Sequence, residues 1–386
     1  MSTTLENVKY LSEIIGPRGS TTLKEKEAAD YIKEKMKWLG IEVSVEPFKF
    51  YPSFSYPYGV LYFLSAMGGL LILTENYFLS FLLSFAALII FFFETHTYEL
   101  ISRLIPHYRS QNVLCKIKPF RQKKRLLVVL THYDTSRSAL TFSPNMVKSF
   151  RFSFLIMVFC LVLIPVFAVL GLIFKENIWS YFALLPSLYL LFVTGLMIHR
   201  EVFCKYSPGA NDNASGVGVL LSLAETLKKQ PLENVEVWFL FTGCEEAGMG
   251  GMQSFLQKHK NEIKQTYFLN VDNVGIGDIK YITAEGMLKS YPANQELISI
   301  AKEVAFSHPE LGAEPKVYNT LTTDALPVLV RGYKVMSIMC FDKEGIIPHW
   351  HWKTDVFANI EVETLNKVDK YLLGIVREID NKLGKG

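Results

Sequence analysis

Two long stretches of this sequence contain almost no charged side chain, which limits where they can reside in a folded protein. Between residues 58 and 93 the only charged residue is Glu75. Between residues 152 and 198 only Lys175 and Glu176 are charged. Outside these stretches about a quarter of the residues are charged, as in ordinary soluble proteins. The sequence therefore predicts a soluble domain that is interrupted twice by apolar inserts.

Each apolar insert divides in two at a short polar break. The resulting segments are Tyr58–Leu73, Tyr77–Phe93, Phe152–Phe174 and Ile178–Ile198. A helix needs about 20 apolar residues to cross a bilayer, so the second pair is long enough and the first pair is short. Buried core helices, or a first hairpin that only dips into the membrane, are the alternatives. Because all four segments are apolar on every face, we predict a multi-pass protein with four helices in a lipid bilayer.

Two membrane hairpins leave three soluble segments on the same side of the bilayer. We therefore expect one catalytic domain made of residues 1–57, 94–151 and 199–386, with hairpins at 58–93 and 152–198. The basic residues near the helix ends lie on the soluble side, and the hairpin tips carry only Lys175. The positive-inside rule then predicts a cytoplasmic catalytic domain. With a net charge of +3, from 40 basic and 37 acidic residues, the chain gives no indication of a nucleic-acid partner.

The soluble segments alternate between strand-like and helix-like patterns. The predicted strands are residues 41–50, 112–117, 125–130, 235–241, 267–271 and 335–339. The predicted helices are two near the N-terminus, one over 217–227 and an amphipathic one over 362–383. Strands that alternate with helices predict an α/β fold with a largely parallel sheet.

Histidines and carboxylates follow directly after three of these strands. They are His132, Asp134, Glu245, Glu246 and Asp272. Ligands of open α/β sheets bind beyond the carboxyl ends of the strands. Two further segments carry similar side chains: the glycine-bounded loop 208–216 with Asp212, and the segment 349–355 with His351. These side chains together predict one site at the carboxyl edge of the sheet.

Imidazole and carboxylate ligands together suit zinc. Two zinc ions that share one carboxylate need five ligands, and the sequence offers His132, Asp212, Glu246, Asp272 and His351. Glu245 is then a spare carboxylate that can serve as a general base. His349 competes with His351, which we favour because only His351 has the HxxxD spacing. Cys244 is a weaker candidate for a nucleophile, because no histidine adjoins it in the sequence.

The order HxD, GxNDNASG, EE, NVD and HxxxD resembles the M28 family of zinc aminopeptidases. The stretches Ile14–Arg18 and Thr323–Pro327 are also similar to that family. The resemblance covers about 300 residues, essentially the whole soluble part, and each motif alone would be weak. It implies an α/β/α sandwich with a central mixed, largely parallel sheet, which the two hairpins interrupt.

The resemblance also implies a role for each site residue. One zinc would be bound by His132, Asp272 and a bridging Asp212. The other would be bound by Glu246, His351 and the same Asp212.

The remaining roles follow from the same resemblance. Glu245 would be the general base, and Asp134 would orient His132 from behind the metal. A cis peptide is expected after Asp212, and Asp355 is expected to support the loop of His351.

The resulting expectation is a membrane-bound two-zinc aminopeptidase that hydrolyses N-terminal peptide bonds of peptide substrates. A single-zinc enzyme similar to glutaminyl cyclases, a carboxypeptidase or dipeptidase, and a non-catalytic membrane scaffold are the alternatives. The soluble segment before the second hairpin ends at Arg151, 17 residues after Asp134, and the next one begins at His199, 13 residues before Asp212. Because both connections are short, we expect the site to lie near the bilayer. Substrates would then be apolar or membrane-derived peptides. If the hairpins are plain anchors, the site instead opens to bulk water.

Overall fold

The centre of the structure is a mixed β-sheet whose strands come from segments far apart in the sequence. The computed structural model describes residues 3–383, and within them the strand order is β1-β2-β4-β3-β5-β9-β6-β7, with β8 paired to β6. The strands are β1 (Glu42–Phe50), β2 (Tyr108–Ile117), β3 (Arg125–His132), β4 (Val235–Thr242), β5 (Tyr267–Val271), β6 (Asp278–Glu285), β7 (Tyr291–Pro292), β8 (Glu314–Tyr318) and β9 (Lys334–Phe341). All six predicted strands are confirmed, whereas β6, β7 and β8 were not indicated by the sequence pattern.

Four neighbouring strands in the middle of the sheet, β4, β3, β5 and β9, run parallel. Antiparallel pairs flank them, with β1 and β2 on one side and β6 on the other. The β3 residues Leu126–Leu130 are buried without a break, which is typical of a parallel strand covered on both faces. The predicted mixed, largely parallel α/β sheet is therefore confirmed.

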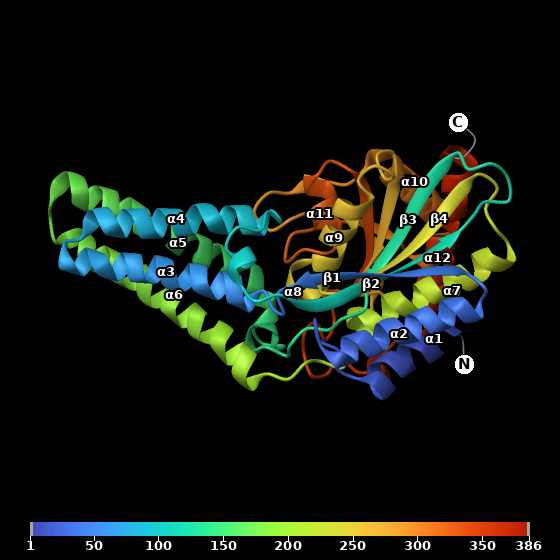
Figure 1. The fold of residues 1–386 in the computed structure, drawn as a ribbon, viewed down its shortest axis with the longest axis horizontal. Helices are drawn as coiled ribbons and strands as arrows, with labels where there is room; N and C mark the ends of the chain where they lie inside the picture. Colours follow the sequence, from blue (N-terminus) through green and yellow to red (C-terminus); the bar gives the residue numbers. More distant parts are fainter. Residues whose placement is uncertain (1–2, 384–386) are drawn as a thin grey trace. The chain divides into compact units, whose positions relative to one another are not determined.

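Helices cover both faces of this sheet (Figure 1). One face carries α1 (Thr3–Lys9), which continues as a π-helical turn (Tyr10–Ile15), α2 (Leu23–Trp38), α7 (Ser215–Lys229), α10 (Gln295–Ser307) and α12 (Val362–Leu383). The other face carries α9 (Gly250–His259) and α11 (Ala325–Val330). Because side chains alternate along a strand, Leu127 and Val129 pack in the first layer and Leu126 and Val128 in the second.

Residues 53–106 and 139–205 form a second compact unit, separate from the sheet and its helices. Its long helices are α3 (Ser55–Leu71), α4 (Tyr77–Thr95), α5 (Phe150–Phe174) and α6 (Ile178–Phe203). Within residues 3–383, four helical segments, 19 to 28 residues long, are long and apolar enough to cross a membrane, judged by length and composition. The first of them, Ser55–Thr74, includes Tyr56 and Pro57 and so reaches 20 residues. The short first hairpin predicted from the sequence is therefore longer at its N-terminal end.

Small residues line the contacts between these four helices. Gly171 in α5 faces the ring of Tyr77 in α4, and a Cβ atom on this glycine would lie 2.2 Å from the nearest ring carbon. Tyr77 packs there with Ala168 and Ala183. Because lipid tails are as apolar as the helices, close packing of this kind is a main source of helix association in membranes.

We predict that Gly171→Ala lowers the thermal unfolding midpoint of the detergent-solubilised protein. The added methyl group would displace the Tyr77 ring, and overpacking of this kind costs about 1–3 kcal/mol. Gly195→Ala in α6 is the matched control, because nothing lies within 4 Å of a Cβ atom there. Equal midpoints for the two variants, measured by differential scanning fluorimetry, would show that the glycine is not needed for packing.

Candidate metal centre

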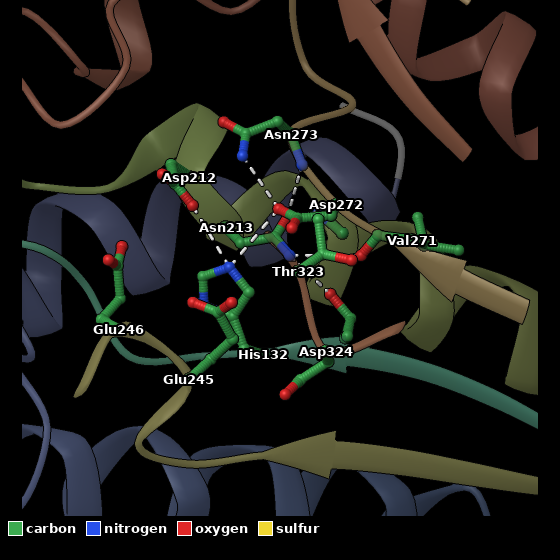
Figure 2. Close-up of polar contacts among 12 residues, drawn as sticks. His132, Asp212, Asn213, Glu245, Glu246, Val271, Asp272, Asn273, Thr323 and Asp324 are labelled. Atoms are coloured by element: carbon green, nitrogen blue, oxygen red, sulfur yellow. Dashed lines mark hydrogen bonds and ion pairs between the residues drawn. The ribbon is translucent and has the colours of Figure 1, made fainter. Parts of the chain in front are cut away.

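His132, the last residue of β3, lies between two aspartates from other segments (Figure 2). Its Nε2 atom is 3.2 Å from Oδ1 of Asp212 and 3.4 Å from Oδ1 of Asp272. Its Nδ1 atom is 3.2 Å from the carbonyl oxygen of Asp134 and 3.7 Å from the carboxylate of the same residue. Asp134 therefore lies behind the imidazole, and its backbone carbonyl makes the shorter contact.

Asp212 lies in a loop that hydrogen bonds hold on several sides. The peptide bond between Asp212 and Asn213 is cis, as the resemblance implies. The carboxylate of Asp355 accepts the N–H groups of Asn211 at 2.6 Å and Asp212 at 3.0 Å. Asp355 thus ties its own loop, which also carries His351, to the loop of Asp212. The Asn213 side chain donates to the carbonyl of Val271, at the end of β5.

A second cluster forms on the other side of Asp212. Nε2 of His351 lies 3.1 Å from Oδ2 of Asp212 and 3.1 Å from Oε2 of Glu246. The donor atoms of His132, Asp212 and Asp272 all lie within 4.8 Å of one another, and the same holds for Asp212, Glu246 and His351. Asp212 therefore belongs to both clusters and presents one carboxylate oxygen to each.

This donor set fits a pair of divalent cations. Each cluster combines one imidazole with two carboxylates, the ligand types that zinc accepts. All five side chains are buried, and buried charges of one sign are costly unless they are paired or bind a metal. Oε1 of Glu246 has no hydrogen-bond partner among the described residues, so it remains available to a ligand.

Glu245 rises from the same loop as Glu246, at the start of the short helix α8 (Glu245–Gly248) (Figure 2). It is half-buried and belongs to neither cluster. Burial raises the pKa of its carboxyl well above the usual value; the charge of His132 opposes this shift and that of Glu246 adds to it. A carboxyl group with a raised pKa, next to two metal-binding clusters, is suited to proton transfer.

Neither of the two alternative residues is suited to the role considered for it. Nδ1 of His349 lies 2.8 Å from the hydroxyl of Thr354, and neither cluster of the described residues includes it. Cys244 is fully buried, and burial raises the pKa of its thiol well above the usual value. A thiol in this state is a poor nucleophile.

Arg18 is a structural residue of the site whose role the sequence did not reveal. Its side chain is fully buried and donates to the carbonyls of Tyr133, Pro208 and Gly209 at 2.6 to 2.7 Å. It therefore links the segment after His132 to the loop of Asp212. The motif Ile14–Arg18 was visible in the sequence, but these partners lie more than 100 residues away.

Comparison with known proteins identifies the family of the chain. A sequence profile of peptidase family M28 matches residues 197–376, which include Asp212, Glu246, Asp272 and His351. This part of the chain is a peptidase M28 domain.

Two curated relatives align with a short part of the chain. Aminopeptidase YwaD of Bacillus subtilis (strain 168) is 39% identical over 72 residues, which is 18% of this chain and 16% of the relative. The alkaline phosphatase isozyme conversion protein of Escherichia coli (strain K12) is 38% identical over 78 residues, or 20% of this chain and 22% of the relative. The matched segments thus span about a fifth of each relative's length.

Solved structures extend the similarity in fold to nearly the whole chain. The zinc aminopeptidase BSAP from Bacillus subtilis superposes with a TM-score of 0.59 at 16% identity, covering 97% of this chain and 94% of that one. A glutaminyl cyclase from Bacteroides thetaiotaomicron gives 0.58 at 16% identity, covering 97% and 96%. At this identity the likeness establishes the fold, which zinc exopeptidases and glutaminyl cyclases share.

Glu285, at the end of β6, is a buried acid beside this centre that the sequence did not indicate. It accepts the N–H and hydroxyl of Thr323 at 2.6 and 2.9 Å and the hydroxyl of Ser337 at 3.3 Å. Burial raises its pKa to about 7, and the charge of Asp272 adds to this effect, while the Thr323 donors oppose it. The folded state therefore binds a proton here that the unfolded chain loses near its ordinary pKa of about 4.5.

We predict that Glu285→Gln flattens the dependence of stability on pH. The raised pKa means that stability from Glu285 is fully present below about pH 4.5, is lost as pH rises to about 7 and then stays constant. The loss is at most about 3 kcal/mol, from 1.36 kcal/mol per pH unit. Thermal midpoints of the metal-free protein at pH 5 and pH 8 test this, with the exposed Glu314→Gln as the control. Parallel profiles for wild type and Glu285→Gln would contradict the prediction.

Proposed function

We propose that this chain is a membrane-bound two-zinc aminopeptidase that hydrolyses N-terminal peptide bonds. The observation that supports this most strongly is the sharing of Asp212 by two clusters of metal-binding side chains, with the unshared carboxylate of Glu245 next to them. One zinc would be held by His132, Asp272 and Asp212. The other would be held by Glu246, His351 and Asp212.

Zinc bound in this way lowers the pKa of water and polarises the carbonyl of the scissile bond. The chain's own residues then supply positioning and proton transfer. Glu245 would accept the proton of the attacking water and deliver it to the amine that leaves. Its raised pKa favours the proton-accepting half of this cycle. Asp134 would keep His132 oriented, because a metal-bound histidine needs a partner on its other nitrogen.

A single-zinc activity similar to that of glutaminyl cyclases is the second candidate, because such enzymes share the fold. The five buried donors in two clusters favour two metals and therefore the peptidase. A non-catalytic scaffold is less well supported, because Glu245 and every proposed ligand are present. Carboxypeptidase or dipeptidase activity would use the same residues and differs only in the substrate end that is recognised.

We also propose that the enzyme acts on apolar peptides at a membrane surface, with its catalytic domain in the cytoplasm. Four helices of the chain have the length and composition of membrane spans. The last of them ends at Phe203, nine residues before Asp212, and nine extended residues reach at most about 32 Å. This connection supports a metal centre near the bilayer. Apolar fragments left by proteolysis within membranes are the corresponding substrate class.

A peptide panel tests the proposed activity directly. Each peptide is supplied with a free and with an acetylated N-terminus, in a short polar and a long apolar version, to the full-length protein in liposomes. We expect cleavage only of peptides with a free N-terminus, and faster cleavage of the apolar ones. Cleavage of acetylated peptides would exclude an aminopeptidase. Equal cleavage rates for polar and apolar peptides would contradict the proposed membrane-derived substrates but not the aminopeptidase activity.

We predict that Glu245→Gln lowers turnover by about two to four orders of magnitude, the range expected for loss of a general base, while zinc content stays at the wild-type level. Glu246→Gln is the matched comparison, because it removes a proposed ligand from the neighbouring position and should reduce bound zinc. Metal analysis of both purified variants, together with peptide turnover, measures the difference. Near-normal turnover of Glu245→Gln would show that another group transfers the proton.

A further inference from the structure

Glu25 is a fully buried acid that lies outside both metal clusters. It is in the first turn of α2, three residues after the N-cap residue Thr22, a spacing that usually indicates a local helix cap. One carboxylate oxygen does serve locally and accepts the N–H of Thr21 at 2.9 Å. The other accepts the N–H of Cys244 at 2.9 Å and the hydroxyl of Ser110 at 3.0 Å. Glu25 therefore bridges α2 to the loop of Glu245.

The same loop is held by a second buried carboxylate. Asp134 accepts the N–H of Glu245 at 3.1 Å and the N–H of Glu246 at 3.2 Å, and its orientation is maintained by the hydroxyl of Ser20 at 2.6 Å. Three consecutive N–H groups, those of residues 244, 245 and 246, thus point at two carboxylates. This arrangement sets the direction in which the first turn of α8 leaves β4.

The loop needs this support because its backbone is strained. Cys244 has a φ of +54°, a conformation that residues other than glycine rarely adopt. At Gly243 a Cβ atom would lie 2.6 Å from the Ser110 hydroxyl and 2.9 Å from Oε1 of Glu25. Strained backbone of this kind persists only where the surroundings enforce it. The contacts of Glu25 enforce it at Cys244, the residue directly before Glu245.

A carboxylate is better suited to this position than an amide. The two backbone N–H groups that face Glu25, those of Thr21 and Cys244, lie on opposite oxygens. Both are donors, so a glutamine could satisfy one of them and would present its own NH₂ group to the other. An unmade buried hydrogen bond costs more than a typical bond contributes, so the loop would have to move.

We propose that Glu25 is a positioning residue that holds Cys244, and through it aims the carboxylate of Glu245 at the reacting atoms. The catalytic part of this proposal rests on the function proposed above. A purely local role, as the cap of α2, is the competing explanation. The two explanations differ in whether Glu25 holds the backbone of residues 244–246 in place. They also differ in whether turnover depends on Glu25 through the position of Glu245.

The test compares Glu25→Gln with Thr22→Ala in the full-length, zinc-loaded protein. Thr22→Ala removes the N-cap of α2, whose hydroxyl accepts the N–H of Glu25, and leaves the Cys244 contact in place. Because burial and the charge of Asp134 raise the pKa of Glu25 to about 8, the measurements are made at pH 9, where it is ionised. Glu25→Asp, which keeps the charge but retracts it from Cys244, is the second variant if Glu25→Gln does not fold.

Hydrogen exchange provides a readout that does not depend on activity. We expect the amides of Cys244 and Glu245 to exchange at least about tenfold faster in Glu25→Gln and at the wild-type rate in Thr22→Ala. Unchanged exchange at both amides in Glu25→Gln and Glu25→Asp would overturn the proposal. This measurement remains decisive for the anchoring of the loop even if the wild-type protein cleaves none of the peptides, a result that would refute the proposed function instead.

Kinetics then separates positioning from stability. We expect Glu25→Gln to lower kcat by about 10- to 100-fold, the size of effect that a small misplacement of a catalytic group produces, with KM within about threefold and zinc content unchanged. In the Glu245→Asp variant the base is already displaced, so adding Glu25→Gln should lower kcat little further. Losses that simply multiply in the double variant, or an equal loss of kcat in Thr22→Ala, would show that Glu25 does not act through Glu245.

Discussion

Concentrated negative charge around Asp212 is the constraint on which the rest of the site depends. Asp212, Asp272 and Glu246 are buried within reach of two imidazoles. The free energy needed to remove these carboxylates from water must be offset by hydrogen bonds and by bound cations. Two further buried carboxylates, Asp355 and Asp134, each accept two main-chain N–H groups from ligand-bearing loops. The clustered acids therefore organise the loops as well as the metal positions.

The parallel centre of the sheet explains why these loops meet. β3, β4 and β5 end at the same edge, so His132, Glu246 and Asp272 converge although they lie up to 140 residues apart. Residues 139–205, which belong to the other compact unit, are inserted between β3 and the loop of Asp212. Where the chain leaves and returns, the N–H of Ser207 bonds to the carbonyl of Ser136 at 2.8 Å. This hydrogen bond joins the two ends of the chain that flank the insertion within the unit that contains the sheet.

Much of the fold was predictable because its elements are strongly patterned. The buried strands are uninterrupted apolar runs, and the four candidate membrane spans are long apolar segments, so local sequence was sufficient to locate them. β6 and β8 escaped prediction because their burial alternates irregularly and polar residues such as Lys280 and Lys316 occur within them. Three members of the two metal clusters, His132, Glu246 and Asp272, were predictable because side chains that follow parallel strands meet at one edge of the sheet. Asp212 and His351 were predicted from the glycine-bounded loop 208–216 and the HxxxD spacing of the segment 349–355.

The sequence by itself determined which residues form the two candidate metal clusters and which segments are long and apolar enough to cross a membrane. The tertiary structure decided how those residues are held: that Asp212 offers one oxygen to each cluster, that Arg18 joins two ligand-bearing segments, and that Glu25 reaches the backbone of Cys244 instead of only capping its own helix. The hydrogen bond from Arg18 to Tyr133 joins residues 115 positions apart, and the one from Cys244 to Glu25 joins residues 219 positions apart. No local pattern encodes such a bond, because its partners are brought together only when the helices pack against the sheet.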